Sequence, residues 1–129
     1  MTGRIDFRYD AANDVIIATP HWKIESEADV IAWYEQYCAF MKKFGRKVDT
    51  VVVSDGLTVS PTVGAKWGEY RAKIHKQFVG YNYRVHCNSQ VRLFVNTSGV
   101  RYDIGREEAA TVEDAIEGIQ EQRRRAKSG

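Results

Sequence analysis

The side chains of this chain that could do chemistry begin with three histidines and two cysteines. The histidines are His21, His75 and His86, and their spacing matches no zinc signature. The cysteines, Cys38 and Cys87, form no CxxC pair. His86 and Cys87 are neighbours, and neighbours on a strand point to opposite faces, so they cannot easily act together as base and nucleophile. We therefore expect no metal, no cofactor and no enzyme activity, with an enzyme based on Cys87 as the less favoured alternative.

Polar residues lie where predicted strands end and where a predicted helix begins. In open α/β sheets, ligands bind beyond the carboxyl ends of the parallel strands, and a helix N-terminus favours anions. These positions predict a ligand or docking rim made of Ser54, Asp55, Ser60, Thr62, Cys87, Asn88 and Ser89. The same residue types also cap helices and form turns, so capping is the alternative explanation.

Aromatic residues are abundant for a core of this size, with three Trp and seven Tyr. Most of them recur at helical spacing, which is typical of residues facing a core. The first predicted helix is apolar around more than one face, which indicates a second buried surface. We expect a self-association face that includes Trp33, Tyr37 and Phe40. Alternatively, these additional aromatic residues could line a pocket for a small apolar ligand.

The elements that must position these residues begin with two strands. Residues 4–9 alternate apolar and polar side chains, which is the period of a half-buried strand. Residues 11–14 supply a turn, and residues 15–18 return as the antiparallel partner. Because Pro20 has no N–H for a sheet ladder, we expect the second strand to end there.

The middle of the chain predicts a helix, a central strand and a second helix. Ser26 can cap the first helix. Residues 50–53 form a short β-branched run, typical of a strand that is covered on both faces. Ser60-Pro61 reads as a helix cap followed by proline at the first helical position. Gly64 and Gly68 lie four apart on this second helix, and we expect them to allow close packing on the sheet.

The segment 90–97 fits two interpretations. Its alternating apolar residues favour a strand. It could also be a helix, capped by Asn88 or Ser89 and ended by Gly99. A helix after the predicted strand at 83–87 would continue the alternation of strands and helices, so we adopt the helix.

The last elements complete the predicted fold. Residues 106–110 are an edge-strand candidate, and Thr111 caps a final helix. We therefore predict an α/β fold of order β-β-α-β-α-β-α-β-α, with a mixed five-stranded sheet, an antiparallel first strand and about four helices. Residues 1–122 would form this single domain, and residues 123–129 a basic, flexible tail or solvated helix end.

Composition limits the partners that such a chain would have. The 129 residues carry 19 basic and 17 acidic side chains, and this balance predicts neither a nucleic-acid partner nor stable membrane insertion. No apolar run reaches about 18 residues, and no signal segment opens the chain. We expect a cytoplasmic protein with reduced thiols.

The element order resembles that of the STAS domain, named for sulphate transporters and anti-sigma-factor antagonists. It is most similar to the small stand-alone bacterial branch. The most specific local likeness is the segment 51–64, an apolar strand followed by an acidic-glycine turn and a helix start. Residues 108–116 are similar to the family's last strand and its capped final helix.

The resemblance implies a regulatory module that acts by binding a protein partner. The second apolar face of the first predicted helix would let that partner be another copy of the chain, as a homodimer. In the family, a kinase phosphorylates a serine at the start of the second helix. The matched position here is Val63, which has no hydroxyl, and the nearby Ser60 and Thr62 do not occupy the matched place. We therefore expect a non-enzymatic interaction module without that phosphoswitch. The alternative is a small-molecule or lipid-binding domain with an apolar pocket between the helices and the sheet.

Overall fold

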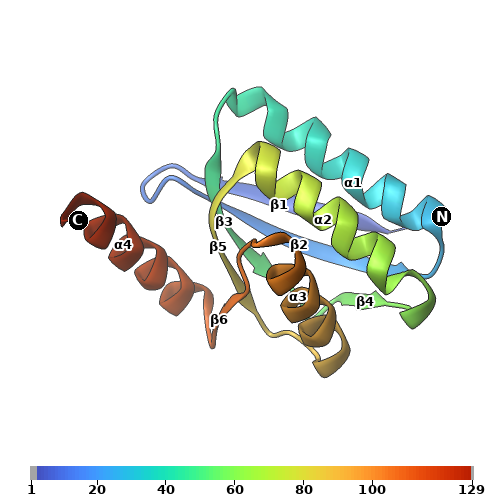
Figure 1. Cartoon of the computed structure of the whole chain (residues 1–129). Helices are drawn as coiled ribbons and strands as arrows, with labels where there is room; N and C mark the ends of the chain where they lie inside the picture. The colour runs from blue at the N-terminus through green and yellow to red at the C-terminus, as the bar shows by residue number, and fades with distance from the viewer. Residues whose placement is uncertain (1–2, 129) are drawn as a thin grey trace.

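Strands and helices alternate along residues 3–128, the part of the chain that this computed structural model describes (Figure 1). The strands are β1 (Arg4–Asp10), β2 (Val15–Ile24), β3 (Val48–Val53), β4 (Leu57–Val59), β5 (Val79–Val85) and β6 (Glu107–Ala109). The helices are α1 (Glu27–Met41), α2 (Gly64–Phe78), α3 (Ser89–Tyr102) and α4 (Val112–Ser128), with 3-10 turns η1 (Lys42–Phe44) and η2 (Pro61–Val63). This confirms the predicted α/β order, with β4 as a strand that the sequence analysis missed.

The strands form one mixed sheet in the order β1-β2-β3-β5-β6. β1 pairs antiparallel with β2, and the remaining pairs are parallel. β3 lies between β2 and β5, which confirms the prediction of a central strand at residues 50–53. Helices α1, α2 and α3 cover one face of the sheet, and α4 covers the other (Figure 1). None of the helices within residues 3–128 is long and apolar enough to cross a bilayer.

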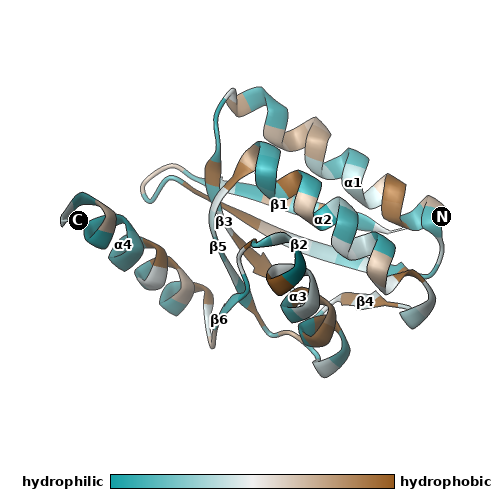
Figure 2. Cartoon of the chain, in the orientation of Figure 1, coloured by the Kyte–Doolittle hydropathy of each residue, from teal (hydrophilic) through white to brown (hydrophobic). Residues whose placement is uncertain are grey.

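The two faces of the sheet support two apolar clusters. Val52 packs into the larger cluster under α1–α3, and its neighbour Val51 packs into the smaller cluster under α4. This alternation explains why β3 is apolar on both faces. In Figure 2 the end of β3 is hydrophobic, whereas α4 is hydrophilic along most of its length. Ala115 and Ile119 are the fully buried residues of that helix.

Pro20 does not end β2, contrary to the sequence prediction. The strand continues to Ile24, and Pro20 lies opposite Ile5 of β1. The parallel ladder with β3 stops at Ala18, and the ladder with β4 starts at Trp22. Pro20 therefore falls in the gap between two parallel ladders, where no partner strand on that side needs its missing N–H.

The segment 90–97 is helical, which confirms the helix over the strand. Asn88 caps α3 through its side-chain oxygen, which accepts a hydrogen bond from the Val91 N–H at 2.8 Å. Gly99 does not end this helix, because α3 continues to Tyr102 and terminates at Asp103 in the left-handed conformation. Gly99 instead lies buried against Arg106, where a Cβ would come within 3.1 Å of the Arg106 Cβ.

The two glycines of α2 face another helix rather than the sheet. A Cβ on Gly64 would lie 2.4 Å from the Phe94 ring, and one on Gly68 would lie 3.0 Å from the Ser98 Cβ. Both contacts are with α3, so the expectation of packing against the sheet was wrong. Small residues here let the two helices approach closely, which compensates for their low helix propensity.

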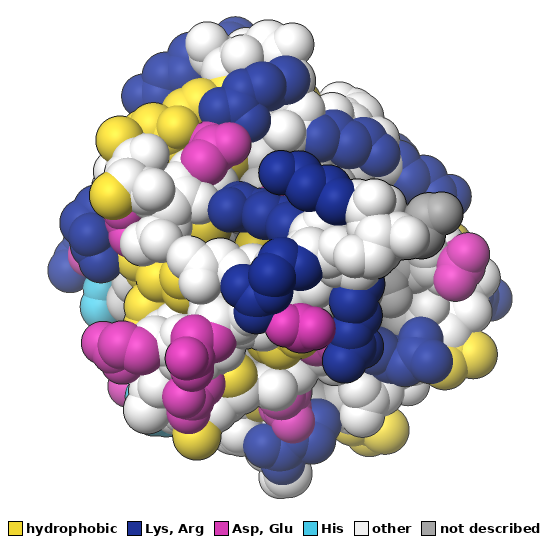
Figure 3. All heavy atoms as spheres, turned by 90° about the vertical axis from the view of Figure 1, so that its left-hand side faces the viewer, with side chains coloured by type: hydrophobic (Ala, Val, Ile, Leu, Met, Phe, Trp, Pro, Cys, Tyr) yellow, Lys and Arg dark blue, Asp and Glu magenta, His cyan; other side chains and the backbone are white. Residues whose placement is uncertain are grey.

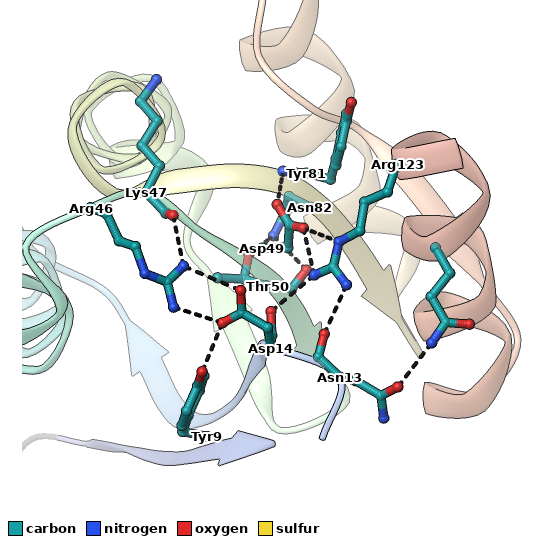
Figure 4. Close-up of polar contacts among 11 residues, drawn as sticks. Tyr9, Asn13, Asp14, Arg46, Lys47, Asp49, Thr50, Tyr81, Asn82 and Arg123 are labelled. Atoms are coloured by element: carbon teal, nitrogen blue, oxygen red, sulfur yellow. Dashed lines mark hydrogen bonds and ion pairs between the residues drawn. The ribbon is translucent and has the colours of Figure 1, made fainter. Parts of the chain in front are cut away.

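Helix α4 continues through the residues expected to form a basic tail. It runs to Ser128, while residue 129 lies outside the described range. Arg123 donates to Asp49 Oδ2 at 2.8 Å and to the carbonyl oxygens of Asn13 and Asp14 at 2.8 and 2.9 Å. Figure 4 shows how these bonds connect α4 to the β1–β2 turn and to β3. Residue 123 is therefore part of the folded domain.

The remaining basic residues of this end gather around helix C-termini. Figure 3 shows Lys and Arg side chains spread over this end of the molecule. The last turns of η1, α2 and α4 contribute Lys42, Lys43, Lys76, Arg125 and Lys127. Cations there complement the negative ends of the helix dipoles, so the patch needs no anionic partner to explain it.

Candidate functional site

The predicted rim residues lie at the carboxyl edge of the sheet, around the starts of η2 and α3. Ser54 follows β3, and its N–H donates to the Val85 carbonyl oxygen at 2.9 Å. The Asn88 amide donates to the Leu57 carbonyl oxygen at 3.0 Å, which connects the start of α3 to β4. The structure thus places the loops after β3 and β5 side by side.

Several of the rim side chains use their polar atoms to cap helices. Ser60 accepts from the Thr62 N–H at 3.4 Å, and the two hydroxyl groups lie 2.9 Å apart. Asn88 caps α3, as described above. Asp55 and Ser89 are exposed, while Ser54 is fully buried. These bonds fit the capping explanation, and a ligand role for the rim stays a prediction.

The strand order offers no crevice of the kind that binds nucleotides in doubly wound folds. Those sites form where the strand order reverses and successive helices lie on opposite faces. Here the order β2-β3-β5-β6 never reverses, and the helices that join these strands all lie on one face (Figure 1).

The structure does not assemble a cysteine nucleophile with a histidine base. Burial raises the pKa of the half-buried Cys87 thiol, which lowers the thiolate fraction at neutral pH. Among residues 3–128, no hydrogen bond joins this thiol to a histidine. His21 pairs with Asp6 at 3.0 Å, and His75 is buried in α2. No cluster of metal-binding side chains is present in the described residues.

The proposed self-association face is largely a core surface. Trp33 and Tyr37 are only 3% and 4% exposed and pack in the cluster under α1–α3. Phe40 is half-buried, and its ring stacks on Phe7 with centroids 4.4 Å apart. The extra apolar face of α1 is thus covered by β1 and α2 of the same chain. A second copy could not bind Trp33 and Tyr37 without disrupting this core.

The space between the helices and the sheet contains a small cavity. The cavity there measures about 10 Å³ and is lined partly by polar side chains. Ligand pockets usually measure about 300–1,000 Å³. This cavity among the described residues is therefore much smaller than the apolar pocket expected for the alternative function, which stays a prediction.

A groove between α2 and α3 is a feature that the sequence analysis did not predict. It encloses about 320 Å³ beside the start of α2. Its lining is Pro61, Gly64, Ala65, Gly68, Leu93, Phe94, Thr97, Ser98, Arg101 and Tyr102. Two apolar residues of α3 are strongly exposed, Leu93 at 61% and Val100 at 71%. In the sequence, the spacing of Gly64 and Gly68 was the signal that could have indicated this groove. The spacing does not show that these glycines face α3, about thirty residues further along the chain.

Val63 occupies the N-cap position of α2, at one end of this groove. Its side chain makes no capping hydrogen bond and packs against the larger apolar cluster. An N-cap side chain normally supplies an oxygen for the exposed N–H groups of the first turn. Val63 therefore contributes packing at a position where a side-chain oxygen would cap the helix.

The strand order and the helix arrangement are those of a STAS-like α/β fold. Among solved structures, the chain is similar to a Thermotoga maritima protein that is provisionally described as an anti-sigma factor antagonist. The TM-score is 0.59, and the match covers 90% of this chain and 94% of the other. Sequence identity is 14%, so this likeness shows the fold alone. No protein-family model and no curated protein matches the sequence.

Proposed function

We propose that this chain is a non-enzymatic regulatory module that binds a protein partner through the groove between α2 and α3. The observation that carries the proposal is the groove itself, bordered by Leu93 with 61% of its surface exposed. Isolated exposed apolar residues are common, but a concave apolar surface with polar neighbours favours docking. The STAS-like fold supports a partner of the anti-sigma-factor class.

The start of α2 belongs to the same proposed surface. Pro61 and Gly64 line the groove, so a partner seated there would also contact the η2 turn. Because Val63 has no hydroxyl, we expect this interaction to be independent of phosphorylation at that position. Incubation with a matching anti-sigma kinase and ATP should leave the chain unmodified in intact-mass measurements. Phosphate on Ser60 or Thr62 would contradict this expectation.

Calorimetric titration against the purified anti-sigma factors of the source organism tests the proposal. We expect one of them to bind, and Leu93→Asp to weaken that binding at least about tenfold, since it places a charge in an apolar contact. The matched control is Ile31→Asp, which changes an exposed apolar residue of α1 that is 37% exposed and lies outside the groove.

The outcomes separate the two possible docking surfaces. Loss of binding in Leu93→Asp with retention in Ile31→Asp supports the groove. The opposite pattern would move the interface to the outer side of α1 and refute this proposal. Absence of binding to every anti-sigma factor tested would refute the assigned partner class.

Self-association remains a separate prediction, and it needs another contact surface because Trp33 and Tyr37 are buried and Phe40 is half-buried. If a dimer forms, the exposed apolar residues of α3 are the candidate contact. Light scattering coupled to size exclusion measures the mass directly. A mass near twice the 14.7 kDa of the chain that falls to the monomer value in Val100→Asp would place the contact on α3.

A further inference from the structure

Two arginines are buried beneath α2 without an acidic partner. Arg71 of α2 is 1% exposed, and Arg84 of β5 is 3% exposed. Among residues 3–128, neither guanidinium forms an ion pair with a carboxylate. Burying a charge is costly unless the charge is paired, so two unpaired cations in one core require an explanation.

Neutral oxygens hold the outer ends of the two side chains. Arg71 donates to Ser98 Oγ at 2.9 Å and also to the Gly105 carbonyl oxygen. Arg84 approaches Ser54 Oγ at 3.5 Å and lies 5.8 Å from the centre of the Trp67 ring. These contacts orient the guanidinium groups, but they do not supply a full negative charge.

The inner edges of both guanidinium groups are unsatisfied. The Nε atoms of Arg71 and Arg84 are buried and have no hydrogen-bond partner within the described residues, 3–128. The indole nitrogen of Trp33 is a third buried donor without a partner. Burial and the neighbouring Arg84 lower the pKa of Arg71 well below its usual range, which is the effect expected of positive charge without a counter-charge.

A small cavity lies at the point where these donors meet. It measures about 10 Å³, which is about the space that one water-sized sphere requires. Arg71, Arg84 and Trp33 all line it, together with His75 and Asn82. Burial, with the charges of both arginines, holds the pKa of His75 well below its usual range, so His75 is neutral at pH 7. The cavity is therefore small, rich in donors and positively charged.

We propose that this cavity binds a single chloride ion between Arg71 and Arg84. Unpaired donors and net positive charge favour an anion over a water molecule. The size of the cavity admits one atom and excludes phosphate, sulfate and carboxylates. Asn82 donates its NH₂ group to the Thr50 Oγ1 and carbonyl oxygen, and its buried Oδ1 has no partner among residues 3–128. The ion would therefore be held by the arginine and indole donors, on the side of the cavity away from that oxygen.

The bound ion would stabilise the packing beneath the groove. Arg71 contacts Ser98 of α3 and Gly105 before β6, so its position links three elements. A chloride beside the guanidinium offsets part of the cost of burying its charge, which favours the folded arrangement of these elements. This inference concerns the interior and does not depend on the proposed docking function.

Thermal unfolding in chloride against gluconate, at equal ionic strength, tests the proposal. Gluconate is too large for the cavity, so it controls for general salt screening. We expect a saturating rise in Tm with chloride of about 5 °C. Arg84→Met should lose this dependence, because it removes one donor and one charge. Arg8→Met, which removes an exposed charge from β1, should keep the dependence of the wild-type chain.

Two further results decide the proposal even if Arg84→Met does not fold. In crystals grown with bromide, the anomalous signal should include a peak between Arg71 and Arg84. Peaks confined to surface arginines would indicate an adventitious ion only and would overturn the proposal. A wild-type Tm that is the same in chloride and gluconate would also overturn it, since a water molecule would then account for the cavity.

Discussion

Replacing Arg123 with methionine should loosen the attachment of α4 to the sheet. The guanidinium makes three short hydrogen bonds, to Asp49 Oδ2 and to the carbonyl oxygens of Asn13 and Asp14 (Figure 4). Its side chain is 30% exposed, and that of Asp49 is 16% exposed. Methionine retains most of the apolar stem but removes every donor.

The structure sets the expected size of this effect. A hydrogen bond to a charged group contributes about 1.5–3 kcal/mol when buried, and partial exposure lets water replace much of that. Asp49 also keeps a bond from the Tyr81 N–H at 2.7 Å, so it is not left without a partner. We expect Arg123→Met to lower the free energy of unfolding by about 2 kcal/mol.

A double-mutant cycle with Asp49→Asn isolates the ionic part of this contact. Asparagine keeps an oxygen for the Tyr81 N–H and removes the charge that Arg123 meets. We expect Asp49→Asn alone to cost about 1 kcal/mol and the coupling energy with Arg123→Met to be about 1 kcal/mol. A coupling energy near zero would mean that Arg123 acts through the two carbonyl oxygens instead.

Urea unfolding, followed by two spectroscopic probes, measures the free energy of unfolding of each variant. Comparing the two probes shows whether the loss of stability is confined to the side of the sheet that α4 covers. Far-UV circular dichroism includes α4, whereas fluorescence reports the opposite face of the sheet through Trp22, Trp33 and Trp67. The control is Arg124→Met, which loses only an exposed pair with Glu121 and should change stability by less than about 0.5 kcal/mol. Equal costs for the two arginine variants would refute the reasoning.

Three further variants or measurements test the core, the helix packing and the thiol. Because His75 has a lowered pKa when folded, its contribution is complete above about pH 6.5, and stability should fall below that by up to about 1.4 kcal/mol per pH unit. Urea titrations at several pH values should show this slope in the wild type and a flatter one in His75→Gln. Gly118→Ala would place a Cβ 2.5 Å from the Tyr83 ring, so it should lower stability by about 1–3 kcal/mol despite a better helix propensity. The exposed neighbour Glu117→Ala is its control, and a stabilised Gly118→Ala would contradict the close α4–β5 approach. At pH 7, Cys87 should react with a disulfide reagent more slowly than a free thiol, since burial raises its pKa; a faster reaction would reopen the enzyme alternative.

Local rules succeeded wherever the deciding contact lies within a few residues. Ser26, Asn88 and Thr111 each cap the helix that follows, through bonds that span three residues. The β-branched run at residues 50–53 could be recognised as a central strand without knowing its partner strands. A strand that is covered on both faces lacks the alternation of apolar and polar residues. Residue types and their spacing are therefore enough to predict the helix caps named here and the central strand.

The same rules failed where a distant element decided the outcome. A proline ends a strand only where a neighbouring strand would accept a hydrogen bond from an N–H at that position. Pro20 lies between the end of the β2–β3 ladder and the start of the β2–β4 ladder, so no such bond is required. Gly64 and Gly68 signal close packing, but only the folded chain shows that α3 is the neighbour. Helical spacing placed Trp33 on an apolar face without showing which element covers that face.

The sequence alone therefore determined the element order, the caps of α1, α3 and α4, and the central strand of a STAS-like fold. The predicted cap Ser60 instead begins the 3-10 turn η2, and α2 starts at Gly64 with Val63 as its N-cap.

Tertiary structure alone decided that Arg71 and Arg84 share one buried cavity and that Arg123 joins α4 to Asp49, which is 74 residues away in the chain. The physical reason is that helix caps and helix hydrogen bonds join residues three or four apart, and the burial of a strand is visible in its own residue types. The environment of a charged side chain depends instead on which distant segments pack around it, and sequence spacing does not record that.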